Sequence, residues 1–237
     1  MQHTTRASFL LSPRFQVLAT WIWNVVGTFL VAAVVAIALP RNIALDRSAL
    51  TEEPSLALIP ILSEIILVGL LPIVFSILRR DKAAEYGITG KCLLVSVISS
   101  AGVVLVYFAY LSIRAGHFTT SVHLPGLHQL TVGNALFAGL GLVAYGPLEA
   151  FFVVWLIHNT DRIFKTEAST WSWGLLMTIA IYGLLHSFSQ GANSLVIAAE
   201  MLALGLVFKN TRNSIGPMLA FMLMNEYAWF LATVFLP

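Results

Sequence analysis

Hydrophobic residues along the chain gather into seven stretches separated by short polar segments. A helix that spans a bilayer needs about 20 apolar residues, and each stretch reaches that length or comes near it. The pattern therefore predicts seven transmembrane helices with short connections. The stretches are Val17–Leu39, Leu56–Leu78, Cys92–Ile113, Val132–Phe164, Trp171–Ser189, Ser194–Phe208 and Ile215–Leu236. The sixth stretch is the shortest and fits the required length least well.

Composition supports a membrane location for the whole chain. Of its 237 residues, 58% are hydrophobic and only 10% are charged, whereas soluble domains carry about 25% charged residues. We expect one integral membrane domain over residues 1–237, of the all-α class. The first stretch exceeds the roughly 7–15 residues of a signal-peptide core, so we expect it to be retained as a span. The single cysteine, Cys92, excludes an internal disulfide.

Basic residues are distributed unevenly between the two predicted sides of the membrane. Ten of the 13 Lys and Arg residues fall in the N-terminal tail and in the second, fourth and sixth connections. The other side holds Arg41, Arg47 and Arg114. Because cytoplasmic loops are enriched in Lys and Arg, this bias predicts a cytoplasmic N-terminus and an external C-terminus. No basic run is dense enough to indicate nucleic-acid binding.

Four carboxylates fall inside apolar stretches, and one histidine, His186, is the only basic side chain at comparable depth. Ionisable groups in the hydrocarbon region are costly and are rarely kept without a use. Some of these carboxyl groups are expected to be neutral at pH 7, and a neutral carboxyl can join two helices as a hydrogen-bond donor. That structural role stays open, above all for Glu64 and Glu200. The four carboxylates are Glu64, Glu149, Glu200 and Glu226.

Glu149 and His186 can lie at one depth. If their helices run antiparallel through the polar turn at 165–170, each residue is 15 positions from that turn, counted from Phe164 and from Trp171. The helical rise then places both about 22 Å from the turn. Asn225 stands about 18 Å above the sixth connection by the same rise. Spacing alone leaves open whether the three side chains face one another.

The dipeptide Gly146-Pro147 precedes Glu149 and predicts a helix break. Proline removes a backbone donor and tends to start a helix, so Glu149 is expected at the start of a helical segment, where the helix dipole favours its charge. Irregular backbone is tolerated in membranes where it lines a buried or hydrated cavity. These features predict a hydrated pocket in which Glu149 and His186 act as general base and acid, while Asn225 stabilises an oxyanion.

Several short segments follow one another in an order that resembles a known family. Glu85-Tyr86-Gly87-Ile88 precedes the third stretch, Pro147-Leu148-Glu149 follows the predicted break, and Tyr182 stands four residues before His186. Ser214-Ile215-Gly216-Pro217 opens the last stretch. Over roughly residues 81–227 the chain resembles the CPBP intramembrane proteases, which comprise CAAX prenyl proteases, among them the Ras-converting endoprotease, and bacteriocin-processing enzymes.

This resemblance implies that Glu149 and His186 form the water-activating pair. Glu149 matches the first glutamate of the family's Glu-Glu-x-x-x-Arg motif, and His186 matches the histidine of its Phe-x-x-x-His motif. Ala150 and Val154 stand where the second glutamate and the arginine are expected.

The family's last motif, His-x-x-x-Asn, is also altered. The expected histidine position falls near Met222 and the expected asparagine near Glu226, one residue from Asn225. The order and spacing of the family's motifs are therefore present, whereas several of their polar residues are replaced.

Three functions remain open on the sequence. The first is a glutamate-dependent intramembrane endopeptidase with Glu149, His186, Asn225 and Glu226 at its site, acting on a hydrophobic or lipid-modified peptide in a prokaryotic plasma membrane. The second is a non-catalytic scaffold, immunity or regulatory protein that binds a transmembrane partner or hydrophobic ligand. The third is a transporter, or a pigment- or metal-binding subunit. No cofactor is expected, although carboxylates with one imidazole suit several divalent metals.

Overall fold

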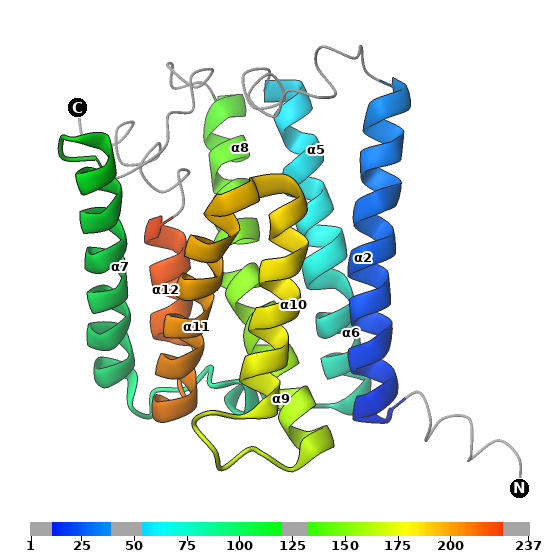
Figure 1. The fold of residues 1–237 in the computed structure, drawn as a ribbon. Coiled ribbons are helices and arrows are strands. Elements are labelled where there is room, and N and C mark those ends of the chain that lie inside the picture. The colour runs from blue at the N-terminus through cyan, green and yellow to red at the C-terminus, as the bar shows by residue number, and fades with distance from the viewer. Residues whose placement is uncertain (1–10, 39–53, 120–131, 225–237) are drawn as a thin grey trace, which may run out of the picture.

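The computed structural model describes residues 11–38, 54–119 and 132–224, and every regular element in these ranges is a helix. The chain forms an upright bundle (Figure 1). In chain order the elements are α2 (Pro13–Ala38), α5 (Pro54–Glu64), η1 (Ile65–Gly69), α6 (Leu70–Arg79), η2 (Ala83–Tyr86), α7 (Leu93–Ala115), α8 (Val132–Val143), η3 (Ala144–Leu148), α9 (Glu149–Phe164), α10 (Trp173–Gln190), η4 (Gly191–Asn193), α11 (Ser194–Thr211) and α12 (Ile215–Met224).

Five of the described helices are long and apolar enough to cross a membrane. They indicate an integral membrane protein and confirm the all-α class, while the total of seven spans and the sidedness stay predictions. The sixth predicted stretch qualifies because its helix continues to Thr211, whereas the apolar segments found for the fifth and seventh, Trp173–Phe188 and Ile215–Met224, are shorter. The five helices are Pro13–Ala38, Leu58–Arg79, Leu93–Ala115, Ala135–Phe164 and Ser194–Thr211.

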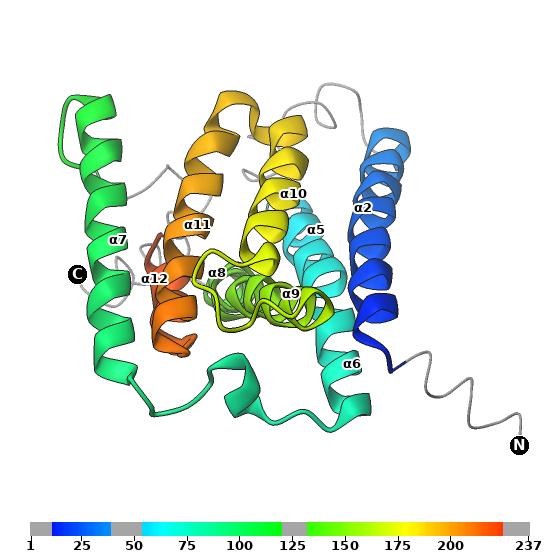
Figure 2. The same ribbon diagram turned by 60° about the horizontal axis from the view of Figure 1, so that its bottom comes forward.

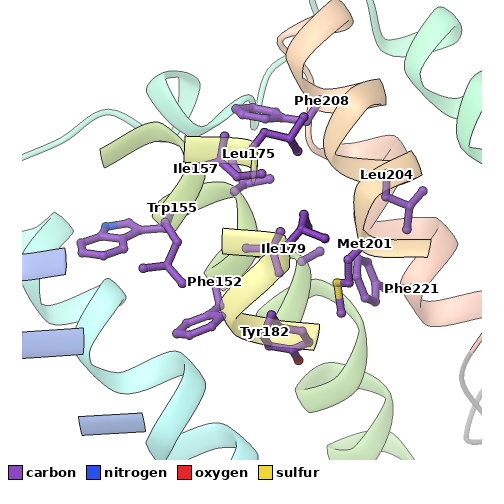
Figure 3. Packing of buried hydrophobic residues seen from close by; sticks show 14 of the residues in the cluster. Phe152, Trp155, Ile157, Leu175, Ile179, Tyr182, Met201, Leu204, Phe208 and Phe221 are labelled. Atoms are coloured by element: carbon purple, nitrogen blue, oxygen red, sulfur yellow. The ribbon is translucent and has the colours of Figure 1, made fainter. Parts of the chain in front are cut away.

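Helix α9 lies at the centre of the bundle. It contacts α2, α10, α11 and α12, as well as η1 and η2, and Figure 2 shows α8 and α9 in the middle with the other helices around them. Aromatic pairs connect it to its neighbours: Phe152 meets Trp21 at a centroid distance of 5.9 Å, and Trp155 stacks on Phe75 at 6.2 Å. Buried apolar side chains from α10, α11 and α12 complete this core (Figure 3).

One end of the bundle, which we term the basic end, holds all but one of the described Lys and Arg residues. Helices α2, α7, α10 and α12 begin there, and α6, α9 and α11 end there (Figure 1). In the described ranges only Arg114 lies at the opposite end. The residues at the basic end are Arg14, Arg79, Arg80, Lys82, Lys91, Arg162, Lys165, Lys209 and Arg212.

Arg79 connects four elements at the basic end. Its Nη1 donates to Gln16 Oε1 at 3.0 Å and to Asn159 Oδ1 at 2.7 Å. Its Nη2 lies 2.7 Å from Asp81 Oδ2 and donates to the Tyr86 hydroxyl. That hydroxyl in turn donates to Asp81. Burial, together with the hydrogen bond to Asp81, raises the pKa of Tyr86, so the phenol stays a donor.

A second buried ion pair joins α9, α10 and α11. Lys209 Nζ lies 2.5 Å from Asp161 Oδ2, with side chains 1% and 2% exposed. Asp161 Oδ1 accepts hydrogen bonds from the Gly174 amide and from the Thr166 hydroxyl, both at 2.8 Å. Lys209 also donates to the Glu167 carbonyl oxygen at 3.1 Å. Both charges are therefore paired and hydrogen-bonded, as buried charges must be.

Asn213 fastens the last connection to the segment before α7. Its Nδ2 donates to the carbonyl oxygens of Thr89 at 2.6 Å and Lys91 at 3.0 Å. Its Oδ1 accepts from the Ile215 amide at 3.0 Å and so caps α12. Ser96 Oγ donates to the Asn213 carbonyl oxygen at 3.1 Å. These bonds fix where α7 and α12 begin relative to each other.

Replacing a glycine by alanine should cost stability where helices are in close contact and not where the glycine faces open space. A Cβ at Gly174 would lie 2.2 Å from the Ile157 carbonyl oxygen and 2.5 Å from Asp161 Oδ1, whereas one at Gly102 would meet nothing within 4 Å. We expect Gly174→Ala to destabilise the fold by about 1–3 kcal/mol and Gly102→Ala to change it by less than about 1 kcal/mol. Thermal unfolding in detergent measures both, and equal losses would contradict this account.

Candidate functional site

The predicted helix break at Gly146-Pro147 is wrong. The backbone passes from α8 through the π-helical turn η3 into α9 without interruption, and both Leu148 and Glu149 have α-helical φ and ψ angles. A π turn inserts one extra residue and so accommodates the proline within a continuous helix. Glu149 consequently has no free helix N-terminus beside it, and the expected stabilisation by the helix dipole does not apply.

A second π turn, η1, directly follows Glu64 and packs against η3. A Cβ at Gly69 would lie 2.6 Å from Leu148 Cδ2, so the two turns approach closely. Trp23 on α2 donates from Nε1 to the Ile66 carbonyl oxygen within η1 at 3.0 Å. Such turns are frequent at functional sites. Here both lie next to a membrane-embedded glutamate.

Gly146 brings η3 against α12. A Cβ at this position would lie 2.4 Å from Met222 Cγ, which a real side chain could not tolerate without movement. Met222 thus packs against Gly146, which lies three residues before Glu149 in the sequence. This contact sets the depth of Glu149 relative to α12.

Glu149 is buried, and its partner is Tyr182 on α10. The Tyr182 hydroxyl donates to Glu149 Oε1, and the two residues are 9% and 4% exposed. Figure 3 shows Tyr182 at the edge of the apolar cluster, with its oxygen turned away from the labelled side chains. The carboxyl group of Glu149 is therefore held by a donor from the neighbouring helix.

His186 lies one helical turn beyond Tyr182. Its Nδ1 is 3.0 Å from the Tyr182 carbonyl oxygen, and the two rings have centroids 4.3 Å apart. Glu149 and His186, which the sequence analysis pairs directly, are thus both in contact with the same tyrosine. The role of Tyr182 as the link between them was not predicted from the sequence. The spacing of four residues between Tyr182 and His186 was the available signal, because it places both on one helix face.

We term Glu149, Tyr182 and His186 the glutamate–tyrosine cluster. Two further carboxyl groups interact electrostatically with it. Electrostatic interactions connect Glu200 on α11 to Glu149 and Glu64 on α5 to Tyr182. One oxygen of each of these carboxyl groups is buried. The predicted site residues Asn225 and Glu226 lie outside the described residues.

Ala150 and Val154 are part of the hydrophobic core. They are 1% and 2% exposed and pack within the main apolar cluster. The positions at which the resemblance to the CPBP proteases would place a second glutamate and an arginine are therefore filled by buried apolar side chains. Within the described ranges, no three His, Cys, Asp or Glu side chains are grouped so that they could hold a metal ion.

Over the described ranges, the fold and the cluster together define an all-helical protein that has helices of transmembrane length and an acid–tyrosine–histidine cluster between α9 and α10. Comparison of the chain with protein-family models, with curated proteins and with solved structures finds no match in any of the three.

Removing the Tyr182 hydroxyl should destabilise the protein. Tyr182→Phe leaves the buried Glu149 Oε1 without this donor, which costs about 1–3 kcal/mol. Tyr110→Phe is the control, because Tyr110 is 40% exposed and its hydroxyl is 3.5 Å from Arg114 Nη1. We expect the control to change stability by less than about 0.5 kcal/mol. Thermal unfolding of both variants in the same detergent measures the difference, and a Tyr182→Phe protein as stable as the control would contradict it.

Proposed function

We propose that the protein is a glutamate-dependent intramembrane endopeptidase that cleaves a hydrophobic or lipid-modified membrane peptide. The observation that supports this most is the carboxyl group of Glu149, buried among the helices and oriented by Tyr182. Ionisable groups held at membrane depth mark functional sites. The resemblance to the CPBP proteases assigns water activation to the same glutamate and to His186.

In the proposed reaction, Glu149 accepts a proton from a water molecule while the water oxygen attacks the scissile carbonyl carbon. Negative charge develops on the carbonyl oxygen, and a nearby donor stabilises it. When the carbon–nitrogen bond breaks, the proton held by Glu149 passes to the leaving nitrogen. One water is consumed and the products are a carboxyl group and an amine, so atoms and charge balance.

Tyr182 and His186 have supporting roles in this proposal. The hydroxyl of Tyr182 fixes the orientation of the Glu149 carboxyl group and supports its ionised form. His186, whose ring contacts that of Tyr182, assists proton transfer. Asn225 or Glu226 would stabilise the oxyanion or the pocket.

The proposed location is the plasma membrane of a prokaryote, with the basic end in the cytoplasm. The concentration of Lys and Arg at that end supports this orientation. The substrate would reach Glu149 from the lipid or from the cytoplasmic side, because the cluster lies within the spanning part of the bundle.

A non-catalytic binding protein is the second candidate, and the burial of Ala150 and Val154 favours it specifically. An apolar core at these positions lacks the polar groups that the related proteases would use. In this case the same fold would bind a transmembrane partner or a hydrophobic ligand. Glu149 would then serve only to join α9 to α10.

Peptide cleavage should depend on the carboxyl group of Glu149. In liposomes with a panel of membrane-anchored peptides, we expect Glu149→Gln to lower kcat by about 10²–10⁴-fold, because the general base is lost. Glu167→Gln is the control, since its side chain lies in the connection after α9. Cleavage that persists in Glu149→Ala would contradict the assignment of Glu149 as the general base. Full cellular function in Glu149→Gln would favour the non-catalytic protein.

The single cysteine offers a direct test of orientation. Cys92 is exposed at the basic end, so a membrane-impermeant maleimide should label it only after the cells are permeabilised. As the matched control, Phe118→Cys in a Cys92→Ser background places a thiol at the opposite end, where Phe118 is 81% exposed. We expect this variant to react in intact cells. The reverse labelling pattern would place the basic end outside.

A further inference from the structure

Glu200 on α11 has an unusual environment for a membrane-embedded carboxyl group. Its Oε1 is buried and makes no hydrogen bond in the described part of the chain. Buried polar atoms are normally paired, and an exception calls for an explanation. The basic end shows the contrast, because there Asp161 and Asp81 each have a cation and further donors. Among the described residues, no cation pairs with Glu200 and no donor reaches its Oε1.

The register of the α10–α11 hairpin places Glu200 beside the glutamate–tyrosine cluster. A Cβ at Gly183 would lie 3.0 Å from Ala198 Cβ, so these two positions face each other. Tyr182 is one residue from Gly183 and Glu200 is two residues from Ala198, both toward the basic end. By the helical rise, their Cα atoms stand within about 1.5 Å of the same level. Glu200 therefore stands at the level of the tyrosine that binds Glu149.

Glu149 also acts electrostatically on Glu200. Two carboxyl groups that interact at close range disfavour a state in which both are ionised, so a state with one proton between them is favoured over a state with none. A pair in this state contains one base and one acid at the same time. Such a pair suits peptide hydrolysis, in which one group accepts a proton from water while the other protonates the carbonyl oxygen in place of an oxyanion.

We propose that Glu200 is the second carboxyl group of the Glu149 site and acts as its proton donor. This inference rests on the proposed endopeptidase function. As Glu149 takes the proton from water, Glu200 donates its own proton to the scissile carbonyl oxygen, which yields a neutral gem-diol. On collapse, the proton on Glu149 goes to the leaving nitrogen and a hydroxyl proton of the diol returns to Glu200. Both carboxyl groups end as they began, and one water is consumed.

Kinetics of Glu200 variants test this role directly. We expect Glu200→Gln to lower kcat by about 10²-fold or more with KM changed by less than about 3-fold, since a lost proton donor affects the chemical step. Glu200→Asp should recover part of kcat, and Glu167→Gln should match the wild type. Unchanged kcat in Glu200→Gln would overturn the inference, even if Glu149→Gln is inactive.

The pH profile separates a proton donor from a merely structural residue. Among the described residues, Glu149 on α9 acts electrostatically on Glu200. Glu149 in turn binds Tyr182, which contacts His186 and on which Glu64 and Tyr145 act. In the wild type, kcat should fall at high pH as the donor loses its proton. Glu200→Gln should abolish this alkaline decline and keep the acidic one, which reports the base. An alkaline decline retained in Glu200→Gln would exclude Glu200 as the donor.

A measurement without substrate separates failure of this inference from failure of the proposed function. In thermal unfolding at pH 7, the Tm shift of the Glu149→Gln/Glu200→Gln double variant should differ from the sum of the single shifts by roughly 2 °C or more, since interacting groups are not additive. Additive shifts would overturn the pairing whatever the activity. Non-additive shifts in a protein that cleaves no peptide would refute the hydrolase and, with it, the donor role of Glu200.

Discussion

The enclosure of α9 is the constraint on which the rest of the structure depends. This helix has neighbours on all sides, so the polar groups on its buried faces can be satisfied only by other parts of the chain. In lipid an unpaired polar group is penalised more than in water, because no solvent can replace the missing partner. Asn159 is therefore bound by Arg79, Asp161 by Lys209 and Glu149 by Tyr182. Each of these bonds reaches a different helix, and together they determine which helices surround α9.

Close contact between neighbouring helices is the second requirement of the bundle. It is met at glycines, which have no side chain to keep the neighbouring helix away. The side chain of Leu148 packs against Gly69, and that of Met222 packs against Gly146. The side chain of Asp161 packs against Gly174. Membrane helices associate through such contacts because burial of apolar surface gives them little advantage over lipid. The two π turns lie at two of these contacts. The positions of Glu64 and Glu149 thus follow from how closely η1 and η3 approach each other.

Sequence patterns were sufficient for the helices but not for their partners. Apolar stretches located the helices because length and hydropathy are local properties, and the basic end matches the uneven count of Lys and Arg along the chain. The pairs Asp161–Lys209 and Glu149–Tyr182 join residues 48 and 33 positions apart, and no local pattern indicates which distant side chain will face which. Gly146-Pro147 indicated an irregular backbone but not its form: proline permits either a break or a π turn, and the structure has the π turn, packed against Met222.

The contrast between the two polar regions of the bundle identifies the one suited to chemistry. At the basic end each buried charge has an opposite charge and several hydrogen bonds, so moving a proton there would break a complete network. At the level of Tyr182, by contrast, Glu149 has a neutral donor, and Glu200 lacks a hydrogen bond to one of its oxygens in the described ranges. A carboxyl group without a cation can gain or lose a proton at smaller cost than one locked in an ion pair. Proton transfer therefore costs least where carboxyl groups have no cation partner. In the described ranges, that place is where Glu149 on α9, Tyr182 on α10 and Glu200 on α11 lie at similar depth.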